Sequence, residues 1–289
     1  MTITLCRPEN AVSAVKLGYP TYSVMPEGYR GAVINWGMSL IRLNESRPQD
    51  VKYCNNPSTI AVSVDKCLFL KTLHFNSLNA PDLIEAGDMA QPGYILRPNS
   101  HAEGSDFKLL TQAEDVNEGY HATKLISPAN EYRVWFFGND KFLTAKRVPI
   151  ASQNQRSNDV CKSKFGYSFD HPNYEKCIDL VKKALAVVRL DFGAFDMLWA
   201  TDERKWYILE VNTAPSLDHS EVKNFFKPLF KAWSQANDVA VTPPQRRPVN
   251  RQAEAPVIEM AGNSDIIRVR KQGGQWIEID LSQLMSSAL

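Results

Sequence analysis

Residues 190–212 constrain the fold of this chain more than any other stretch. They read as two apolar strands joined by a polar turn at residues 201–205, in the segment LDFGAFDMLWATDERKWYILEVN. Acidic side chains interrupt both apolar runs, and a charge beside a buried strand is costly unless something pairs with it. The hairpin must therefore lie in a sheet that supplies partners for its acids, above all for Glu210.

Antiparallel pairing predicts which residues of the hairpin face each other. With the turn centred on Glu203, Glu210 lies opposite Asp196, and Asn212 lies one step further on the same face. Two facing carboxylates with Cβ atoms ~5 Å apart repel each other, so a half-buried pair needs a cation or a shared proton. The same register predicts two pairs nearer the turn: Ile208 with Leu198, and Trp206 with Ala200.

Oxygen ligands from Asp196, Glu210 and Asn212 are the set that Mg²⁺ prefers. For a single acid on a strand, an ion pair at a solvated sheet edge is the ordinary interpretation. Two acids and an amide that converge at the ends of two apolar strands favour a metal site instead. The predicted site depends on the register of the hairpin, because a one-residue slip would break the pairing of Asp196 with Glu210.

Composition excludes several classes of function. The chain has 289 residues and a net charge of +1. Its overall electrostatic potential therefore does not indicate a nucleic-acid or membrane partner. It has no apolar run of ~20 residues and no apparent signal peptide. Its five cysteines are scattered without a Cys-x-x-Cys pair, which predicts reduced thiols in a cytoplasmic protein.

Hydrophobic periodicity predicts the other elements. Strands are expected at residues 2–6 and 31–35, within a small α/β unit, and at residues 80–84 and 93–98. A helix is expected from Ser63 as its N-cap, with Asp65 at its positive end. A hairpin is expected at residues 131–148, with its turn at residues 138–140.

Two apolar stripes at helical spacing predict further core helices. The first follows Pro172 and consists of Tyr174, Cys177, Ile178, Val181, Ala184, Leu185 and Val188. The second consists of Phe225, Phe226, Phe230 and Trp233. The proline-rich residues 241–256 read as a linker, and a last hairpin is expected around Gly273 and Gly274.

The motif DFGAFDMLW…YILEVNTAPSL resembles the metal-binding end of the ATP-grasp superfamily, which includes D-alanine–D-alanine ligase, glutathione synthetase and ribosomal-protein glutamate ligases. The resemblance covers residues 63–231. It implies an ATP-grasp fold of the α+β or α/β class, a small α/β domain followed by two α+β lobes that clasp ATP. The expected parts are the N-terminal α/β domain (1–62), the ATP-grasp domain (63–240), the linker (241–256) and a C-terminal hairpin appendage (257–289).

The resemblance implies that Asp196, Glu210 and Asn212 bind Mg²⁺ ions, which in turn bridge the phosphates of ATP. Mn²⁺ is the alternative ion. It implies that ATP phosphorylates a carboxylate and that an amine then displaces the phosphate. Arg97 matches the basic residue that approaches the phosphates, the alternative being a surface ion pair. The loop at residues 99–107 takes the place of a glycine-rich phosphate loop but has fewer glycines. Its candidate phosphate contacts are His101, Gly104 and Ser105.

The resemblance also implies an adenine site at the backbone of Lys124, Leu125 and Ile126. Glu131 matches the carboxylate that binds the ribose hydroxyls, the alternative being a surface acid. Arg133 lies on the same strand face and serves phosphate or the carboxylate substrate.

Three more residues bear on the phosphate and substrate sites. Lys146 and Arg147 lie on opposite faces of a strand, and we favour Lys146 for phosphate. Ala194 stands where many family members carry an arginine for the reacting acyl group. Ser216 replaces a frequent glycine, which narrows or re-aims the acceptor site.

Together these features predict an ATP-dependent carboxylate–amine ligase with small-molecule or peptide substrates. The alternatives are a kinase of the same fold that phosphorylates a hydroxyl, and a nucleotide-binding module without turnover. The complete set of metal ligands argues against the last. The terminal hairpin has one apolar face, which we expect to dock on a second copy of the chain in a homodimer or, as the alternative, on its own chain.

Overall fold

The computed structural model describes residues 1–39, 51–99, 107–149, 163–166, 173–238, 258–260, 266–270 and 276–280. These residues belong to two compact units, Met1–Val241 and Thr242–Leu289. The first unit contains every element that bears on the candidate site.

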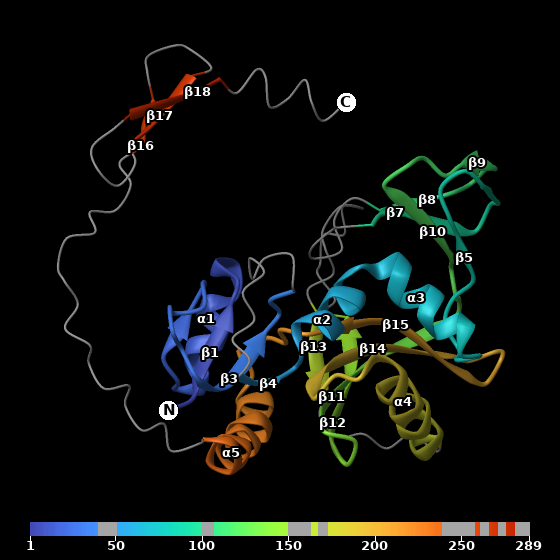
Figure 1. Cartoon of the computed structure of the whole chain (residues 1–289). Helices are drawn as coiled ribbons and strands as arrows, with labels where there is room; N and C mark the ends of the chain where they lie inside the picture. Colours follow the sequence, from blue (N-terminus) through green and yellow to red (C-terminus); the bar gives the residue numbers. More distant parts are fainter. Residues whose placement is uncertain are drawn as a thin grey trace. The chain divides into compact units, whose positions relative to one another are not determined.

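The N-terminal part is a parallel sheet with strand order β2-β1-β3-β4 (blue in Figure 1). Its strands are β1 (Ile3–Cys6), β2 (Thr21–Tyr22), β3 (Gly31–Trp36) and β4 (Val51–Cys54). Between β1 and β2 lie η1 (Pro8–Asn10), α1 (Ala11–Ala14) and η2 (Val15–Leu17). The predicted strands at residues 2–6 and 31–35 are confirmed, whereas β4 was not predicted.

Two short helices, α2 (Pro57–Val64) and α3 (Lys66–Phe75), follow the parallel sheet. Asp65 caps α3 by accepting a hydrogen bond from the backbone N–H of Leu68 at 2.9 Å. The prediction that Ser63 is the cap is wrong, because Ser63 lies in α2 and donates its hydroxyl to the carbonyl of Thr59. Residue 63, the expected start of the second domain, thus lies inside a helix.

A small antiparallel sheet of order β5-β10-β7-β8 follows. Its strands are β5 (Leu83–Ile84), β7 (Tyr94–Pro98), β8 (Lys108–Leu109) and β10 (Tyr120–Lys124). β6 (Met89–Ala90) and β9 (Glu114–Asp115) pair beside it. A small core packs under this lobe, made of Ala90, Leu96, Leu110, Val116 and Ala122.

The largest sheet is antiparallel, with strand order β13-β12-β11-β14-β15. Its strands are β11 (Ala129–Phe137), β12 (Lys141–Pro149), β13 (Ser163–Gly166), β14 (Phe192–Ala200) and β15 (Lys205–Asn212). The β11–β12 pair confirms the hairpin predicted at residues 131–148. The β14–β15 pair is the hairpin that carries the predicted metal ligands.

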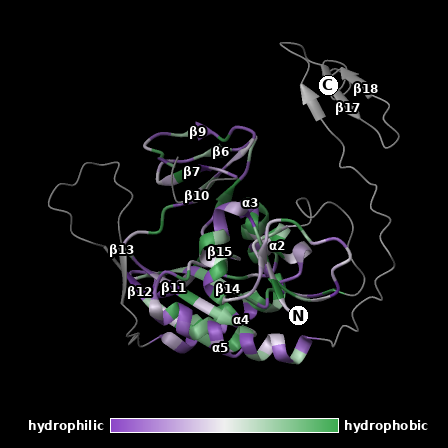
Figure 2. Ribbon diagram, turned by 90° about the vertical axis from the view of Figure 1, so that its left-hand side faces the viewer, coloured by the Kyte–Doolittle hydropathy of each residue, from purple (hydrophilic) through white to green (hydrophobic). Residues whose placement is uncertain are grey.

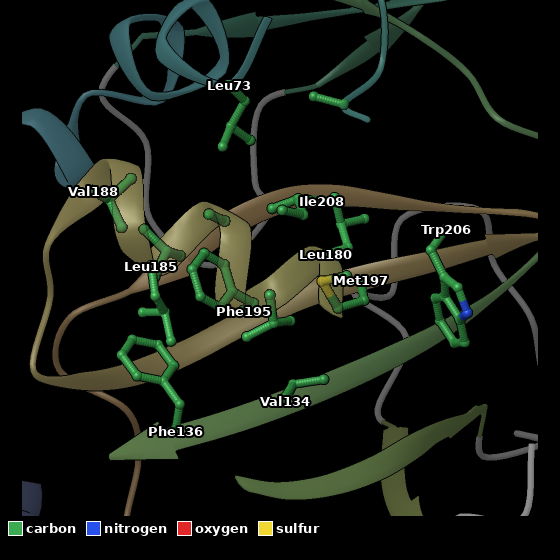
Figure 3. Close-up of a cluster of buried hydrophobic side chains, with 14 of the residues drawn as sticks. Leu73, Val134, Phe136, Leu180, Leu185, Val188, Phe195, Met197, Trp206 and Ile208 are labelled. Carbon is green, nitrogen blue, oxygen red and sulfur yellow. The ribbon is translucent and has the colours of Figure 1, made fainter. Parts of the chain in front are cut away.

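One face of this sheet packs against α3 and α4 (Tyr174–Val188) (Figure 3). Every residue of the predicted α4 stripe except Tyr174 is buried. Phe195, Met197 and Ile208 meet the helices from the sheet side and are fully buried. The period of the apolar residues therefore placed α4 correctly.

The opposite face of the sheet is apolar at one end and charged at the other. At the apolar end, Trp135 and Phe192 pack against Trp36 of β3 and against α5 (Ser220–Asn237). Phe226 and Phe230 of the predicted aromatic stripe are fully buried there. Polar and apolar residues alternate around α4 and α5, as expected for helices that cover a sheet (Figure 2). The charged end of this face remains for the candidate site.

The second unit contains β16 (Ile258–Met260), β17 (Ile266–Arg270) and β18 (Trp276–Asp280) in an antiparallel sheet. β17 and β18 confirm the predicted last hairpin, whereas β16 was not predicted. The turn at Gly273 and Gly274 and the expected linker at residues 241–256 lie outside the described residues. Among the described helices, none is both long and apolar enough to cross a membrane.

Candidate metal and nucleotide site

The β14–β15 hairpin brings the two predicted acids together. Asp196 faces Glu210, as the sequence predicted, and Ala194 faces Asn212. The pairs nearer the turn were predicted one residue off, because Trp206 faces Trp199 and Ile208 faces Met197.

An irregularity between Asp196 and Met197 resolves this difference, because the ladder shifts there by one residue at Leu209. Trp206 and Ile208 point into the helix-side core before the bulge, and Glu210 points to the other face after it. Without the bulge, period-two alternation would turn Glu210 toward the helices. The bulge is thus what places both acids on one face.

Each acid has a cation of its own. Lys66 Nζ lies 2.6 Å from Glu210 Oε2. Arg133 binds Asp196 through two bonds, Nε to Oδ1 at 2.5 Å and a terminal guanidinium nitrogen to Oδ2 at 2.7 Å. Asn212 completes the group, with its amide nitrogen 3.5 Å from Asp196 Oδ2. The buried acids of the apolar hairpin thus have the charged partners that their burial requires.

Lys66 was not predicted as a site residue, although one feature of the sequence indicates it. Lys66 is the first residue of α3, where the helix dipole disfavours a positive charge. A lysine at that position needs an acid nearby, and Glu210 is that acid.

The two acids have different electrostatic environments. Burial raises the pKa of Asp196, and the neighbouring Glu210 adds to the increase against the charge and hydrogen bonds of Arg133. Burial also opposes ionisation of Glu210, but the charge and hydrogen bond of Lys66 outweigh it and lower the Glu210 pKa. Glu210 is therefore the firmly ionised member of a pair whose like charges interact.

Arg97 supplies a partly buried cation from β7 of the small sheet, with its Nε fully buried. Burial lowers the Arg97 pKa, against the attraction of Glu210 and Glu131. Its Nε has no hydrogen-bond partner among the described residues. A buried guanidinium N–H without an acceptor suits an anionic ligand oxygen. The cross-strand neighbour of Arg97 is His121, whose Nδ1 lies 2.8 Å from Asn99 Oδ1 at the end of β7.

The prediction that Lys146 points into the site is wrong. Lys146 faces Tyr132 in the β11–β12 register, and its Nζ lies 5.9 Å from the Tyr132 ring centroid on the helix side of the sheet. Arg147 is the basic residue on the site face, where it binds Glu131 Oε2 at 2.9 Å. The choice between adjacent residues depended on a register that the sequence of β12 alone does not give.

The predicted adenine-binding segment continues directly from β10. The backbone N–H of Lys124 donates to Asp82, and that of Leu125 donates to Gly93, each at 2.9 Å. These bonds fix the segment at the end of the small sheet. The N–H groups of Lys124 and Leu125 are therefore used within the protein. An adenine ring would have to bind the N–H of Ile126 or backbone carbonyl groups of this segment.

The loop after Asn212 is fastened to the N-terminal part. The Ser216 hydroxyl bonds the Asp218 carboxylate, which also pairs with Lys16. The backbone N–H of Leu217 donates to Ser13 Oγ at 2.9 Å. Ser216 is thus held by its own loop, and its predicted role at the acceptor site stays a prediction. The candidate phosphate contacts His101, Gly104 and Ser105 lie outside the described residues.

The donor set fits a hard divalent cation. Asp196 and Glu210 offer carboxylate oxygens on one face of the hairpin, and Asn212 lies beside them with an amide whose oxygen would bind the ion after a rotation of the side chain. In the described part of the chain, no three His, Cys, Asp or Glu side chains gather as a metal-binding group. An amide ligand and ligands from outside the protein are therefore needed, as is usual for Mg²⁺.

The solved structures that resemble this chain include several ligases. No protein-family model matches the chain, and no curated protein matches it. Among solved structures, the ATP-grasp ligase PsnB complexed with a minimal precursor has 13% identity and a TM-score of 0.54, with 80% of this chain and 97% of that chain covered. The D-alanine–D-alanine ligase from Bacillus anthracis has 11% identity and a TM-score of 0.54, with 81% and 94% covered. The same ligase complexed with ATP has 13% identity and a TM-score of 0.51, with 81% and 92% covered.

Proposed function

We propose that this chain, which has the ATP-grasp fold, is an ATP-dependent ligase that joins a carboxylate to an amine through an acyl-phosphate. The observation that carries the proposal is the facing pair Asp196 and Glu210, with Asn212 beside them on the same face of the hairpin. A fold used by ligases supports the reaction class, and this group of oxygen ligands supports turnover rather than binding alone.

The metal that suits this group is Mg²⁺, held by Asp196, Glu210 and Asn212, and it would neutralise phosphate charge during transfer. Lys66 and Arg133 neutralise the acids in the metal-free protein. With a divalent cation bound, both side chains become available to anionic groups of the reactants.

The remaining residues of the site orient the reactants. Arg97 has a buried Nε–H without a partner among the described residues and feels the charges of Glu210 and Glu131, so it would donate to a phosphate oxygen. Arg133 is held on the site face by Asp196 and is suited to a carboxylate or phosphate. Catalysis of this kind relies on positioning and charge neutralisation and needs no protein nucleophile.

The nucleotide is proposed to lie along the strand face that begins at Glu131. Glu131 is half-exposed and paired with Arg147, so its carboxylate can exchange this surface partner for ribose hydroxyls at little cost. The segment Lys124–Ile126 would supply backbone groups to the adenine edge. One of the solved relatives is complexed with ATP, which supports ATP as the nucleotide.

The test is a screen of carboxylate and amine pairs with purified full-length chain, ATP and Mg²⁺. Coupled release of ADP and free phosphate, with a product mass equal to the condensed pair, is the expected result. Release of ADP without phosphate would instead indicate phosphorylation of a hydroxyl and overturn the ligase assignment.

Glu210→Gln tests the metal site directly. It keeps the shape of the side chain but removes its charge. A loss of several kcal/mol of transition-state stabilisation corresponds to a fall in turnover of roughly 10²–10³-fold. Glu27→Gln is the matched control, because Glu27 is exposed and lies between β2 and β3 of the N-terminal sheet. Near-parental turnover by the Glu210 variant would rule out the metal assignment.

A further inference from the structure

A pocket of about 250 Å³ lies in the described part of the chain, on the helix side of the large sheet. It lies between α4, the turn end of the β14–β15 hairpin and Asn79, which follows α3. Trp199 and Trp206 line it from the face of the sheet opposite to Asp196 and Glu210 (Figure 3 labels Trp206). The pocket is therefore separate from the candidate nucleotide site.

Basic side chains dominate its rim. Lys176 and Lys183 project from α4, seven residues apart and so on one face of the helix. Arg204 approaches from the hairpin turn, where it has a left-handed backbone with φ of 52°. The single carboxylate of the lining is that of Asp179, so positive charge is in clear excess.

Among the described residues, Lys176, Lys183 and Arg204 have no ion-pair partner. Lys205 also lines the pocket, but its Nζ lies 5.1 Å from the ring centroid of Tyr207 on the opposite face of the sheet, so its charge is not counted with theirs. Like charges that converge on one hollow raise the local concentration of anions.

Two packed indole rings form the floor of the pocket. Trp199 and Trp206 are both buried, with ring centroids 5.2 Å apart. The Trp206 indole N–H donates to the carbonyl of Asn173 at 3.1 Å, just before α4 begins. The two elements that carry the cations are thus locked together through this floor, which reduces the cost of ordering them around a ligand.

We propose that this pocket binds a small polyanion, a molecule with two or more carboxylate or phosphate groups. The volume is below the ~300 Å³ at which pockets for drug-sized ligands begin, which favours a compact ligand. The rim side chains are exposed, so the affinity should fall steeply with ionic strength. This second site is independent of the proposed ligase activity.

The test is isothermal titration of the full-length, metal-free chain with citrate and, separately, with pyrophosphate at low salt. Saturable binding of one equivalent is expected for at least one probe. A preference for citrate identifies a polycarboxylate ligand, and a preference for pyrophosphate identifies a phosphate ligand. Titration with sodium chloride at equal ionic strength controls for screening.

Variants locate the binding. The double variant Lys183→Gln and Arg204→Gln should weaken binding at least tenfold, and unchanged circular dichroism would show that it folds. Lys182→Gln, an exposed neighbour outside the pocket, and Glu210→Gln, at the candidate metal site, should leave the affinity unchanged. The proposal is overturned if neither probe saturates, or if the double variant binds as tightly as the parent.

Discussion

The substitution Asn55→Ala should destabilise the fold more than most single changes. Asn55 is fully buried directly after β4, and its side chain joins the parallel sheet to the start of β14. Its amide nitrogen donates to the carbonyl of Phe192 at 2.9 Å. Its amide oxygen accepts from the backbone N–H groups of Asp191 and Phe192 at 2.7 and 3.1 Å.

The size of the stability loss follows from the backbone groups that lose their hydrogen-bond partner. Alanine leaves two N–H groups and one carbonyl unpaired at a buried junction, and each costs ~1–3 kcal/mol. With some relaxation and water entry, we expect a loss of about 3–6 kcal/mol. Asn55 also has a left-handed φ of 67°, which adds about 1 kcal/mol for alanine. Domains are stable by only ~5–15 kcal/mol, so this loss is a large share.

Urea unfolding followed by tryptophan fluorescence measures the effect. Asn55→Gly removes the same hydrogen bonds but tolerates the left-handed backbone, so it should be about 1 kcal/mol less destabilising than alanine. Asn237→Ala is the control, because it removes a single hydrogen bond at the end of α5 and should cost less than ~1.5 kcal/mol. A loss below about 1 kcal/mol for Asn55→Ala would refute the reasoning.

Three other predictions test the site and the core. Lys66→Met leaves Glu210 without its cation, so it should lower the melting temperature measured without metal. It should also increase the rise in melting temperature that Mg²⁺ produces. An equal rise in parent and variant would contradict this. Gly193→Ala puts a Cβ 2.8 Å from the carbonyl oxygen of Asn212, so we expect a loss of about 1–3 kcal/mol in urea unfolding and lower turnover, and an unchanged variant would refute the close packing. Burial raises the pKa of Cys177 to about 12, so the folded thiol stays protonated. The stability it contributes is complete below the ordinary thiol pKa and is lost as the pH rises from there toward 12. Cys177 should resist alkylation at pH 8 until urea is added, as peptide mass spectrometry would show; labelling of the folded chain at the unfolded rate would contradict the burial.

Local pattern was sufficient for much of the fold. The α4 stripe, the β11–β12 hairpin and the β14–β15 hairpin all follow from the period of apolar residues, which directly reflects which side chains face a core. The strands that were missed, such as β4 and β16, are short or follow proline-rich stretches without clear alternation. The facing of Asp196 and Glu210 was also predicted, although the bulge that makes it possible was not.

Contacts between distant segments were decided only by the tertiary structure. Lys66 reaches Glu210 from a helix 144 residues earlier in the chain, and Arg147 rather than Lys146 joins Glu131 on the site face. The alternation of side chains along a strand indicates which residues share a face. The register with the neighbouring strands determines which face packs against the helices and which forms the candidate site. That register depends on the packing of the whole sheet, and so do the partners of the buried charges.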